Sequence, residues 1–219
     1  MIRAIISDFG GVLTTPLGNS FAAWSRESGI PLEDLGIAMA SAAERHDSHP
    51  LFVLEKGLIT QEEFIQRLEA ELTPGPTGEK RRLDTMLDVY FDHLERNHEM
   101  IALMRDLRGR ALRMALLTNN VREWEPRWRA LLPEIDEIFE LVVDSAFVGM
   151  RKPEPEIYEL TLERLGGEVE ASECVFVDDI ALNCDAAAEL GMTAVVFEST
   201  EQARGEIEEA LARPPGRPR

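Results

Sequence analysis

The sequence predicts an α/β fold, a Rossmann-like parallel sheet with helices on both faces and an inserted helical cap. Short apolar runs recur along the chain, and segments with helical spacing separate them. These two observations predict the sheet and its helices. The cap is predicted because the first apolar run ends at residue 7 and the second begins only at 113. A single crossover helix does not need a connection of that length.

The apolar runs are short, and such lengths suit buried parallel strands better than helices. They cover residues 4–7, 113–117, 141–144, 174–177 and 194–197. The segments with helical spacing cover residues 98–108, 126–132, 155–165, 182–190 and 201–211. Strands that alternate with helices in this way predict a parallel sheet covered on both faces.

The long stretch between the first two runs is helix-like throughout. Thr60 with Glu63 three residues later is typical of a helix N-terminus. Two apolar stripes with helical spacing follow, formed by Phe64, Ile65, Leu68 and Leu72 and then by Leu83, Met86, Leu87, Tyr90, Phe91 and Leu94. Pro74-Gly75-Pro76 is predicted to break the chain between the two stripes. We therefore expect an inserted helical bundle over the mouth of the sheet.

These patterns divide the chain into two parts. Residues 1–15 and 97–219 are expected to form the α/β core, and residues 16–96 the cap domain. The tail after Leu211 is rich in proline and arginine, and is expected to be frayed.

Composition and charge restrict the possible partners. Of the 219 residues, 44% are hydrophobic and 29% charged, which is ordinary for a soluble globular protein. Acidic residues outnumber basic ones by 41 to 23, and the formal net charge is −18. Such a charge repels nucleic acids and anionic membrane surfaces, so neither is expected as a partner. An anionic substrate would require a local cation.

Cysteine content and apolar segments indicate a location. The two cysteines, Cys174 and Cys184, are too few for a disulfide framework and read as free thiols in a reducing compartment. The first apolar run is too short for a signal peptide, and no stretch approaches the ~18 apolar residues of a membrane span. We therefore expect a cytoplasmic protein. The pattern gives no indication of oligomeric state.

Polar side chains follow the predicted strands, and the carboxyl ends of parallel strands meet at one rim, where ligands bind. Asp8 follows the first strand, Thr118 the second, Lys152 comes after the third, and Asp178 and Asp179 end the fourth. Each has a structural alternative: a turn former, a helix N-cap, a solvated lysine, and caps of the next helix. Their combination in this order favours a catalytic site, because few structural needs explain that set.

These motifs resemble those of the haloacid dehalogenase-like superfamily over nearly the whole chain. The first motif is Asp8-Phe9-Gly10-Gly11-Val12-Leu13, the second ends in Thr118, the third contains Lys152, and the fourth is Val177-Asp178-Asp179. The long helical insert matches the first cap type of that superfamily, and the segment Glu55-Lys56-Gly57-Leu58-Ile59-Thr60 resembles the same branch.

The resemblance implies a Mg²⁺-dependent hydrolase that acts on a small-molecule phosphate monoester. Asp8 would be the nucleophile and would form an aspartyl-phosphate intermediate. Mg²⁺ would be held by Asp8, the Gly10 carbonyl, Asp178 and Asp179. Thr118 and the backbone N–H of Asn119 would bind a phosphoryl oxygen. Lys152 would neutralise charge on Asp8 and on the phosphoryl group. It would therefore also be the local cation that an anionic substrate requires in a protein with this net negative charge.

One position departs from the pattern. Most phosphatases of the superfamily carry a second aspartate two residues after the nucleophile, as a general acid and base, and Gly10 stands there instead. General acid–base help is typically worth about 10²–10⁴-fold. Either another group supplies the proton, or the leaving group needs no acid, or the reaction is not ordinary phosphate hydrolysis. Candidate donors are the threonines and cap histidines Thr14, Thr15, His46 and His49.

Two other functions remain open. The dehalogenases of the superfamily also lack the second aspartate, so carbon–halogen hydrolysis by Asp8 is the first alternative. The acidic pair Asp178-Asp179 argues against it, since those enzymes need no metal. The second alternative is a non-catalytic domain that binds a phosphorylated ligand or a protein. Candidate substrate-pocket residues are Trp24, His46, His49, Phe52 and Trp124.

Overall fold

The computed structural model describes residues 1–167 and 169–213. Five parallel strands form one sheet in the order β3-β2-β1-β4-β5. In chain order they are β1 (Ala4–Ser7), β2 (Arg113–Thr118), β3 (Leu141–Asp144), β4 (Cys174–Asp178) and β5 (Thr193–Val196). Ile5 on the central strand is in register with Met114 on one side and Val175 on the other. The predicted α/β fold class is confirmed.

Alternation along the strands supplies both faces of the sheet with apolar side chains. Ile5 points to a face covered by α6 (His98–Gly109), α7 (Glu125–Leu131), α8 (Ile135–Ile138) and α12 (Thr200–Ala212). Ala4 and Ile6 point to the opposite face, covered by α10 (Pro155–Arg164) and α11 (Ala181–Glu189). A strand buried on both faces reads as a continuous apolar run, which is why these runs were recognisable in the sequence.

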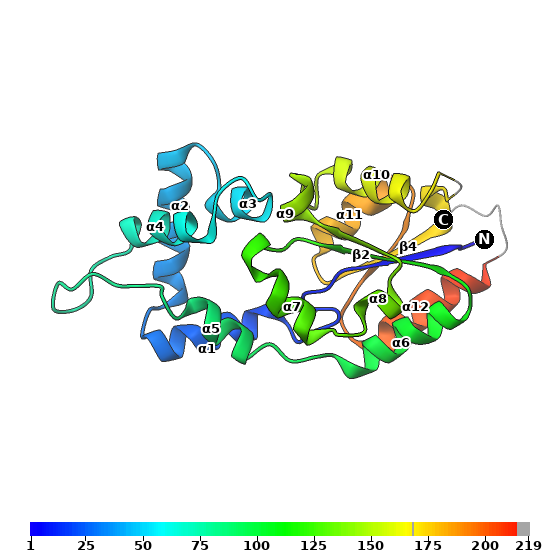
Figure 1. Cartoon of the computed structure of the whole chain (residues 1–219), viewed down its shortest axis with the longest axis horizontal. Coiled ribbons are helices and arrows are strands. Elements are labelled where there is room, and N and C mark those ends of the chain that lie inside the picture. Colours follow the sequence, from blue (N-terminus) through cyan, green and yellow to red (C-terminus); the bar gives the residue numbers. More distant parts are fainter. Residues whose placement is uncertain (168, 214–219) are drawn as a thin grey trace.

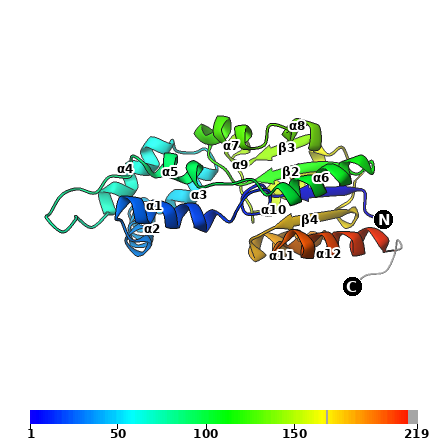
Figure 2. The same cartoon turned by 90° about the horizontal axis from the view of Figure 1, so that it is seen from below.

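A second group of helices lies beyond the carboxyl ends of the strands (Figures 1 and 2). It consists of α1 (Leu17–Ser28), α2 (Leu32–His46), α3 (Pro50–Glu55), α4 (Gln61–Glu71) and α5 (Met86–Asp92). These helices share a core of their own, with Trp24, Phe64 and Leu68 fully or almost fully buried. The Thr60 hydroxyl caps α4 by accepting the Glu63 N–H at 3.1 Å, as predicted.

The expected second stripe in this bundle forms a shorter helix than its spacing predicts. α4 ends at Glu71 and α5 begins at Met86, and a loop with Pro74-Gly75-Pro76 joins them. Proline lacks an N–H donor and glycine is conformationally free, so this segment does not continue the helix. A break at Pro74-Gly75-Pro76 is thus confirmed, and the loop around it extends from residue 72 to 85, so residues 16–96 are not helical throughout.

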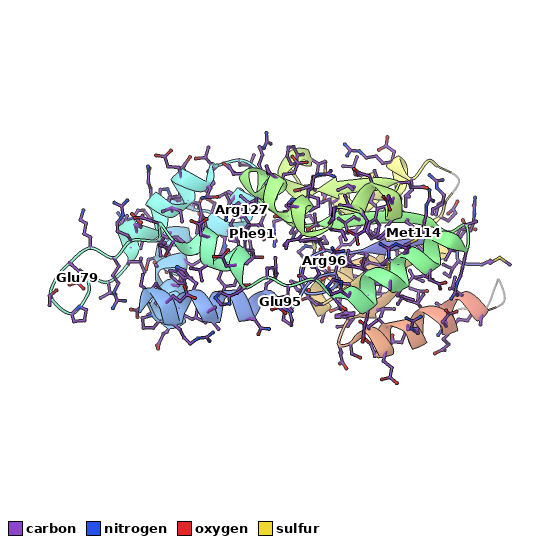
Figure 3. All side chains as sticks on the ribbon, turned by 60° about the horizontal axis from the view of Figure 1, so that its bottom comes forward. Glu79, Phe91, Glu95, Arg96, Met114 and Arg127 are labelled. Carbon is purple, nitrogen blue, oxygen red and sulfur yellow. The ribbon has the colours of Figure 1, made fainter. Side chains whose placement is uncertain are left out.

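Two chain segments join the helical bundle to the sheet, and they pair with each other. Thr14 and Arg96 form an antiparallel bridge, and the Thr15 N–H donates to the Glu95 carbonyl at 2.8 Å. Glu95 and Arg96 lie in the extended segment between α5 and α6 (Figure 3). The division into residues 1–15 with 97–219 and residues 16–96 stays a prediction, and it would place both boundaries at this paired crossing.

Two further expectations concern the rest of the chain. None of the helices in the described ranges is both long and apolar enough to cross a membrane. The tail expected to be frayed falls mainly on residues 214–219, which lie outside the described residues, whereas α12 continues to Ala212. Among the described residues of the α/β core, four short helical elements were not predicted: η1 (Arg122–Trp124), α8, α9 (Ser145–Val148) and η2 (Ala171–Glu173).

Candidate active site

Asp8 lies at the carboxyl end of the central strand, in a turn that needs glycine. The Asp8 N–H donates to the Val177 carbonyl at 2.9 Å, and the carboxylate accepts the Phe9 N–H at 2.7 Å. Gly11 has a φ of 77°, and a Cβ there would lie 2.1 Å from an Asp179 carboxylate oxygen. The glycine therefore lets the turn bring Asp179 close to Asp8, and a side chain at this position would force them apart.

Lys152 is buried between two carboxylates. Its side chain is 1% exposed, and Nζ lies 2.8 Å from Asp8 Oδ1 and 2.6 Å from Asp178 Oδ2. Asn119 fixes the lysine backbone with two hydrogen bonds, because its Oδ1 accepts the Lys152 N–H at 2.8 Å and its Nδ2 donates to the Lys152 carbonyl at 2.9 Å. The solvated-loop interpretation of Lys152 is thus excluded. The bracing role of the Asn119 side chain was not foreseen.

Asp178 is fully buried and hydrogen-bonded on both oxygens. Oδ2 faces Lys152, and Oδ1 accepts the Ile180 N–H and the Asn183 side-chain Nδ2, each at 2.9 Å. A carboxylate in such a position is stable only when its lone pairs are satisfied. These contacts fix the orientation of Asp178 toward Asp8.

The site carries more negative charge than Lys152 offsets. Burial, together with the neighbouring Asp178 and Asp179, raises the pKa of Asp8 to about 8 against the lowering effect of Lys152. Burial and Asp178 also raise the pKa of Asp179. The pKa of Lys152 is raised, because the attraction of Asp178 and Asp8 exceeds the opposing effect of burial. A bound cation would relieve the repulsion among the carboxylates.

The three carboxylates fit a divalent metal. Ligand oxygens of Asp8, Asp178 and Asp179 all lie within 4.8 Å of one another. Magnesium is a hard cation that prefers oxygen ligands and is commonly bound through one or two carboxylates with several waters. The donor type, the burial and the excess negative charge therefore suit Mg²⁺. The Gly10 carbonyl as a further ligand stays a prediction.

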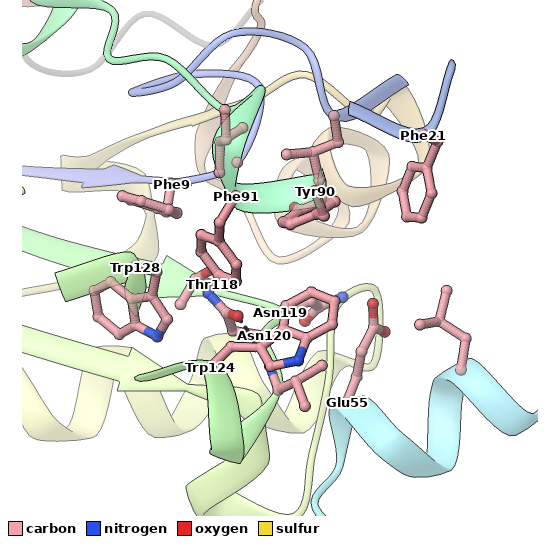
Figure 4. Close-up of a pocket in the computed structure, with 15 residues that line it drawn as sticks. Phe9, Phe21, Glu55, Tyr90, Phe91, Thr118, Asn119, Asn120, Trp124 and Trp128 are labelled. Atoms are coloured by element: carbon pink, nitrogen blue, oxygen red, sulfur yellow. Dashed lines mark hydrogen bonds between the residues drawn. The ribbon is translucent and has the colours of Figure 1, made fainter. Parts of the chain in front are cut away.

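A pocket opens beside this rim, between the sheet and the helical bundle (Figure 4). The cavity measures about 120 Å³. Its lining includes Gly10, two residues after Asp8, and Thr118 and Asn119 from the carboxyl end of β2. The remaining lining is mostly aromatic and aliphatic and comes from both parts of the chain: Phe9, Leu17, Phe21, Leu51, Glu55, Tyr90, Phe91, Leu94, Asn120, Val121, Trp124 and Trp128.

Of the side chains expected in the substrate pocket, only Trp124 is among the lining residues. Trp24 lies in the core of the helical bundle at 0% exposure, and His46 is exposed at the end of α2. His49 stacks on Phe52 with ring centroids 4.2 Å apart, away from the pocket lining. Residue type alone could not separate these positions, because aromatic side chains serve bundle core and pocket equally well.

The two threonines considered as replacements for the missing acid are held by the turn. Thr14 Oγ1 accepts the Gly11 N–H at 3.1 Å and donates to the Thr15 carbonyl at 3.0 Å. Thr15 Oγ1 accepts the Glu95 N–H at 3.1 Å. The Thr14 hydroxyl therefore stabilises the turn after Asp8 and the Thr15 hydroxyl the crossing to Glu95, and neither residue lines the pocket described above.

A carboxyl group that the sequence reasoning missed lies in the pocket wall. Glu55, the last residue of α3, points into the pocket (Figure 4), and Oε2 accepts the Arg151 Nε–H at 2.7 Å. Burial raises the pKa of Glu55 even though Arg151 and Lys152 lower it. Beside it, Lys56 pairs with Glu154 at 2.5 Å. Two ion pairs thus tie α3 to the segment that carries Lys152.

Comparisons with known proteins agree with this geometry. Residues 2–191 match the model of the haloacid dehalogenase-like hydrolase family. The chain is 31% identical over 217 residues to acyl-CoA dehydrogenase family member 10 from Mus musculus, covering 97% of this chain and 19% of that protein. It is 27% identical over 210 residues to a phosphatase from Mycobacterium tuberculosis, covering 93% and 90%. The chain belongs to the haloacid dehalogenase-like hydrolase family.

A solved structure supports the same fold. A family enzyme from Bacteroides thetaiotaomicron, in complex with magnesium and inorganic phosphate, superposes with a TM-score of 0.66 at 23% identity, over 90% of this chain and 95% of that one. The chain spans only 19% of the length of the mouse relative and 38% of bifunctional epoxide hydrolase 2 from Sus scrofa. Those relatives therefore contain large regions without a counterpart here.

Proposed function

We propose that this protein is a Mg²⁺-dependent phosphatase that hydrolyses a phosphate monoester of a small metabolite through an aspartyl-phosphate on Asp8. The observation that carries the proposal is the position of Lys152 Nζ, 2.8 Å from Asp8 and 2.6 Å from Asp178 at the rim where Asp179 also lies. One ammonium and three carboxylates at the mouth of a parallel sheet suit a nucleophile, a metal and an anionic phosphoryl group.

Each residue then has a defined task. The Asp8 carboxylate attacks phosphorus, the ester P–O bond breaks, and the alcohol leaves with its electron pair and takes up a proton. Water then attacks the phosphorus of the aspartyl-phosphate, which releases inorganic phosphate and restores Asp8. Lys152 offsets charge on Asp8 and on the phosphoryl oxygens. The Thr118 hydroxyl and the Asn119 N–H bind a phosphoryl oxygen.

The metal would be held by Asp8, the Gly10 carbonyl, Asp178 and Asp179. When bound, Mg²⁺ supplies positive charge that offsets the phosphoryl oxygens and lowers the repulsion between them and the attacking carboxylate. The names of the relatives support this assignment, since the Mycobacterium tuberculosis protein is called a phosphatase and the Bacteroides thetaiotaomicron enzyme holds magnesium and phosphate.

The experiment is turnover of p-nitrophenyl phosphate with Mg²⁺ and with EDTA. Its phenolate is a good leaving group, so the absence of a side-chain acid at Gly10 has little effect on the rate. We expect Mg²⁺-dependent release of p-nitrophenol that is lost in Asp8→Asn. Asp88→Asn is the matched control, because Asp88 is an exposed carboxylate that pairs with Arg127. Turnover that survives in Asp8→Asn would refute the assigned nucleophile.

One observation favours a second candidate, carbon–halogen hydrolysis by the same nucleophile. The pocket beside Asp8 is largely apolar, as a halide cradle requires. The two reactions differ in their need for metal, because a carboxylate that displaces halide from carbon faces no phosphoryl charge. Turnover of a 2-haloacid in the presence of EDTA, without turnover of p-nitrophenyl phosphate, would assign this activity instead.

A further inference from the structure

The pocket that adjoins the phosphoryl site has walls of aromatic rings from both parts of the chain. Phe91 and Trp124 meet edge to face with centroids 5.7 Å apart, and Tyr90 lies 5.1 Å from the same indole. On the other side, Phe9 next to the nucleophile packs on Trp128 at 5.3 Å. Figure 4 shows these rings around the space that begins at Thr118. The surface offered to a bound molecule is therefore mostly hydrocarbon.

Several polar groups in this wall already have protein partners. The Trp124 Nε1–H donates to Gln61 Oε1 at 2.6 Å, and both ends of the Asn119 amide bond the Lys152 backbone. The Asn120 Oδ1 accepts the Val121 N–H at 2.9 Å. The Trp128 Nε1–H is a buried donor without a protein partner, but the wall around it is mostly ring and aliphatic carbon. A ligand with several hydroxyls would therefore lose more bonds to water than it gains from the wall. The pocket thus disfavours a polyhydroxylated body such as a sugar.

The charge of the wall disfavours a second anionic group on the ligand. Glu55 contributes a carboxylate that is already paired with Arg151. The chain as a whole carries a net charge of −18. Lys152 lies at the phosphoryl end and is shared by Asp8 and Asp178. A nucleotide or a phosphorylated acid would bring negative charge to a wall that has no spare cation among its lining residues.

We propose that the pocket holds the alcohol portion of the substrate and that this portion is an uncharged hydrocarbon group of about the size of one ring. The proposal rests on the proposed phosphatase function. The cavity of about 120 Å³ is close to the roughly 150 Å³ of an apolar cavity known to bind benzene. The substrate class is therefore a phosphate monoester of a hydrophobic alcohol, not a sugar phosphate or a nucleotide.

The first test compares phosphate esters of two primary alcohols, benzyl phosphate and ribose 5-phosphate, with acetyl phosphate as a third substrate that leaves the pocket empty. We expect kcat/KM for benzyl phosphate to exceed that for ribose 5-phosphate by at least about 10-fold. Hydrolysis of acetyl phosphate together with an equal or reversed preference would overturn the pocket proposal and leave the phosphatase function standing. If none of the three substrates is hydrolysed, the phosphatase function is refuted instead.

Binding tests the pocket independently of turnover. In the presence of Mg²⁺, calorimetry should show that benzylphosphonate binds at least about 10-fold more tightly than 2,3-dihydroxypropylphosphonate. Phe91→Ala, shown to be folded by circular dichroism, should weaken benzylphosphonate binding at least about 5-fold. Phe147→Ala is the matched control, because Phe147 is 50% exposed and lies outside the pocket lining, and it should bind as the wild type does. Equal affinity of the wild type for the two phosphonates would overturn the proposal.

Discussion

Replacing Lys152 by methionine should lower the free energy of unfolding by about 3–5 kcal/mol in the absence of Mg²⁺. The Lys152 ammonium is 1% exposed and lies within 2.8 Å of Asp8 and Asp178. Methionine is close to lysine in length but carries no charge, so two buried carboxylates would be left without their shared cation. Removing one partner of a buried ion pair lowers the free energy of unfolding by more than the intact pair contributes to it, because the remaining charge stays desolvated.

The assay is urea unfolding at neutral pH with EDTA, followed by circular dichroism. For a chain of this size, a loss of about 3–5 kcal/mol corresponds to a fall in melting temperature of roughly 6–20 °C. Lys56→Met is the matched control: Lys56 also forms an ion pair, with Glu154, but the two side chains are 25% and 35% exposed. A pair in contact with solvent contributes about 0–1 kcal/mol, so the control should change stability less than Lys152→Met does.

Two further measurements separate charge from packing. Mg²⁺ should reduce the loss in Lys152→Met, because the metal supplies positive charge among the same carboxylates. The double substitution Asp8→Asn with Lys152→Met should be less destabilised than Lys152→Met alone, since one uncompensated carboxylate is gone. A Lys152→Met variant no less stable than Lys56→Met would refute the reasoning, and equal loss with and without the Asp8 substitution would indicate packing instead.

Three more predictions follow from the same structure. Asn119→Ala should lower kcat by about 10–100-fold in steady-state assays, because it removes both hydrogen bonds that position the Lys152 backbone. Mg²⁺ at about a hundred times its Kd should stabilise the wild type by about 2.7 kcal/mol in thermal unfolding, and Asp178→Asn should lose most of that gain. Burial raises the pKa of Asp144 to about 6 from its ordinary 3.8, so the folded protein binds the extra proton and stability falls as pH rises from about 4 to 6. Asp144→Asn should therefore be more stable than the wild type by about 1–3 kcal/mol at pH 7 but not at pH 4, with unfolding curves at both values as the check.

The sheet was predictable because its signal is local. Each strand is buried on both faces, so residues such as Ala4, Ile5 and Ile6 must all be apolar, and the run is visible without knowledge of its neighbours. The positions of Asp8, Thr118 and Asp178 at strand ends followed from the rule that parallel strands share a carboxyl edge. The predicted loop lysine, Lys152, belonged to the same set through its place after the third strand.

Contacts between distant segments were not predictable in this way. The break at Pro74-Gly75-Pro76 was predictable but its extent was not, because the loop runs from residue 72 to 85 and leaves Leu83 outside the helix that its stripe predicted. Trp24 and Trp124 have the same side chain and were both pocket candidates, yet one fills the core of the helical bundle and the other lines the pocket. Their roles depend on how the bundle docks on the sheet.

The sequence alone predicted the kind of chemistry, because an aspartate, a lysine and an acidic pair that follow successive strands point to the same rim. Only the tertiary structure decided how that rim is completed. In the folded chain, Lys152 Nζ lies between Asp8 and Asp178, and the Asn119 side chain accepts a hydrogen bond from the Lys152 backbone. Glu55 and Phe91 of the helical bundle line the pocket beside them. The physical reason is the range of the interactions. The burial pattern of each strand is visible in neighbouring residues, whereas ion-pair geometry and pocket lining depend on segments that meet only after folding.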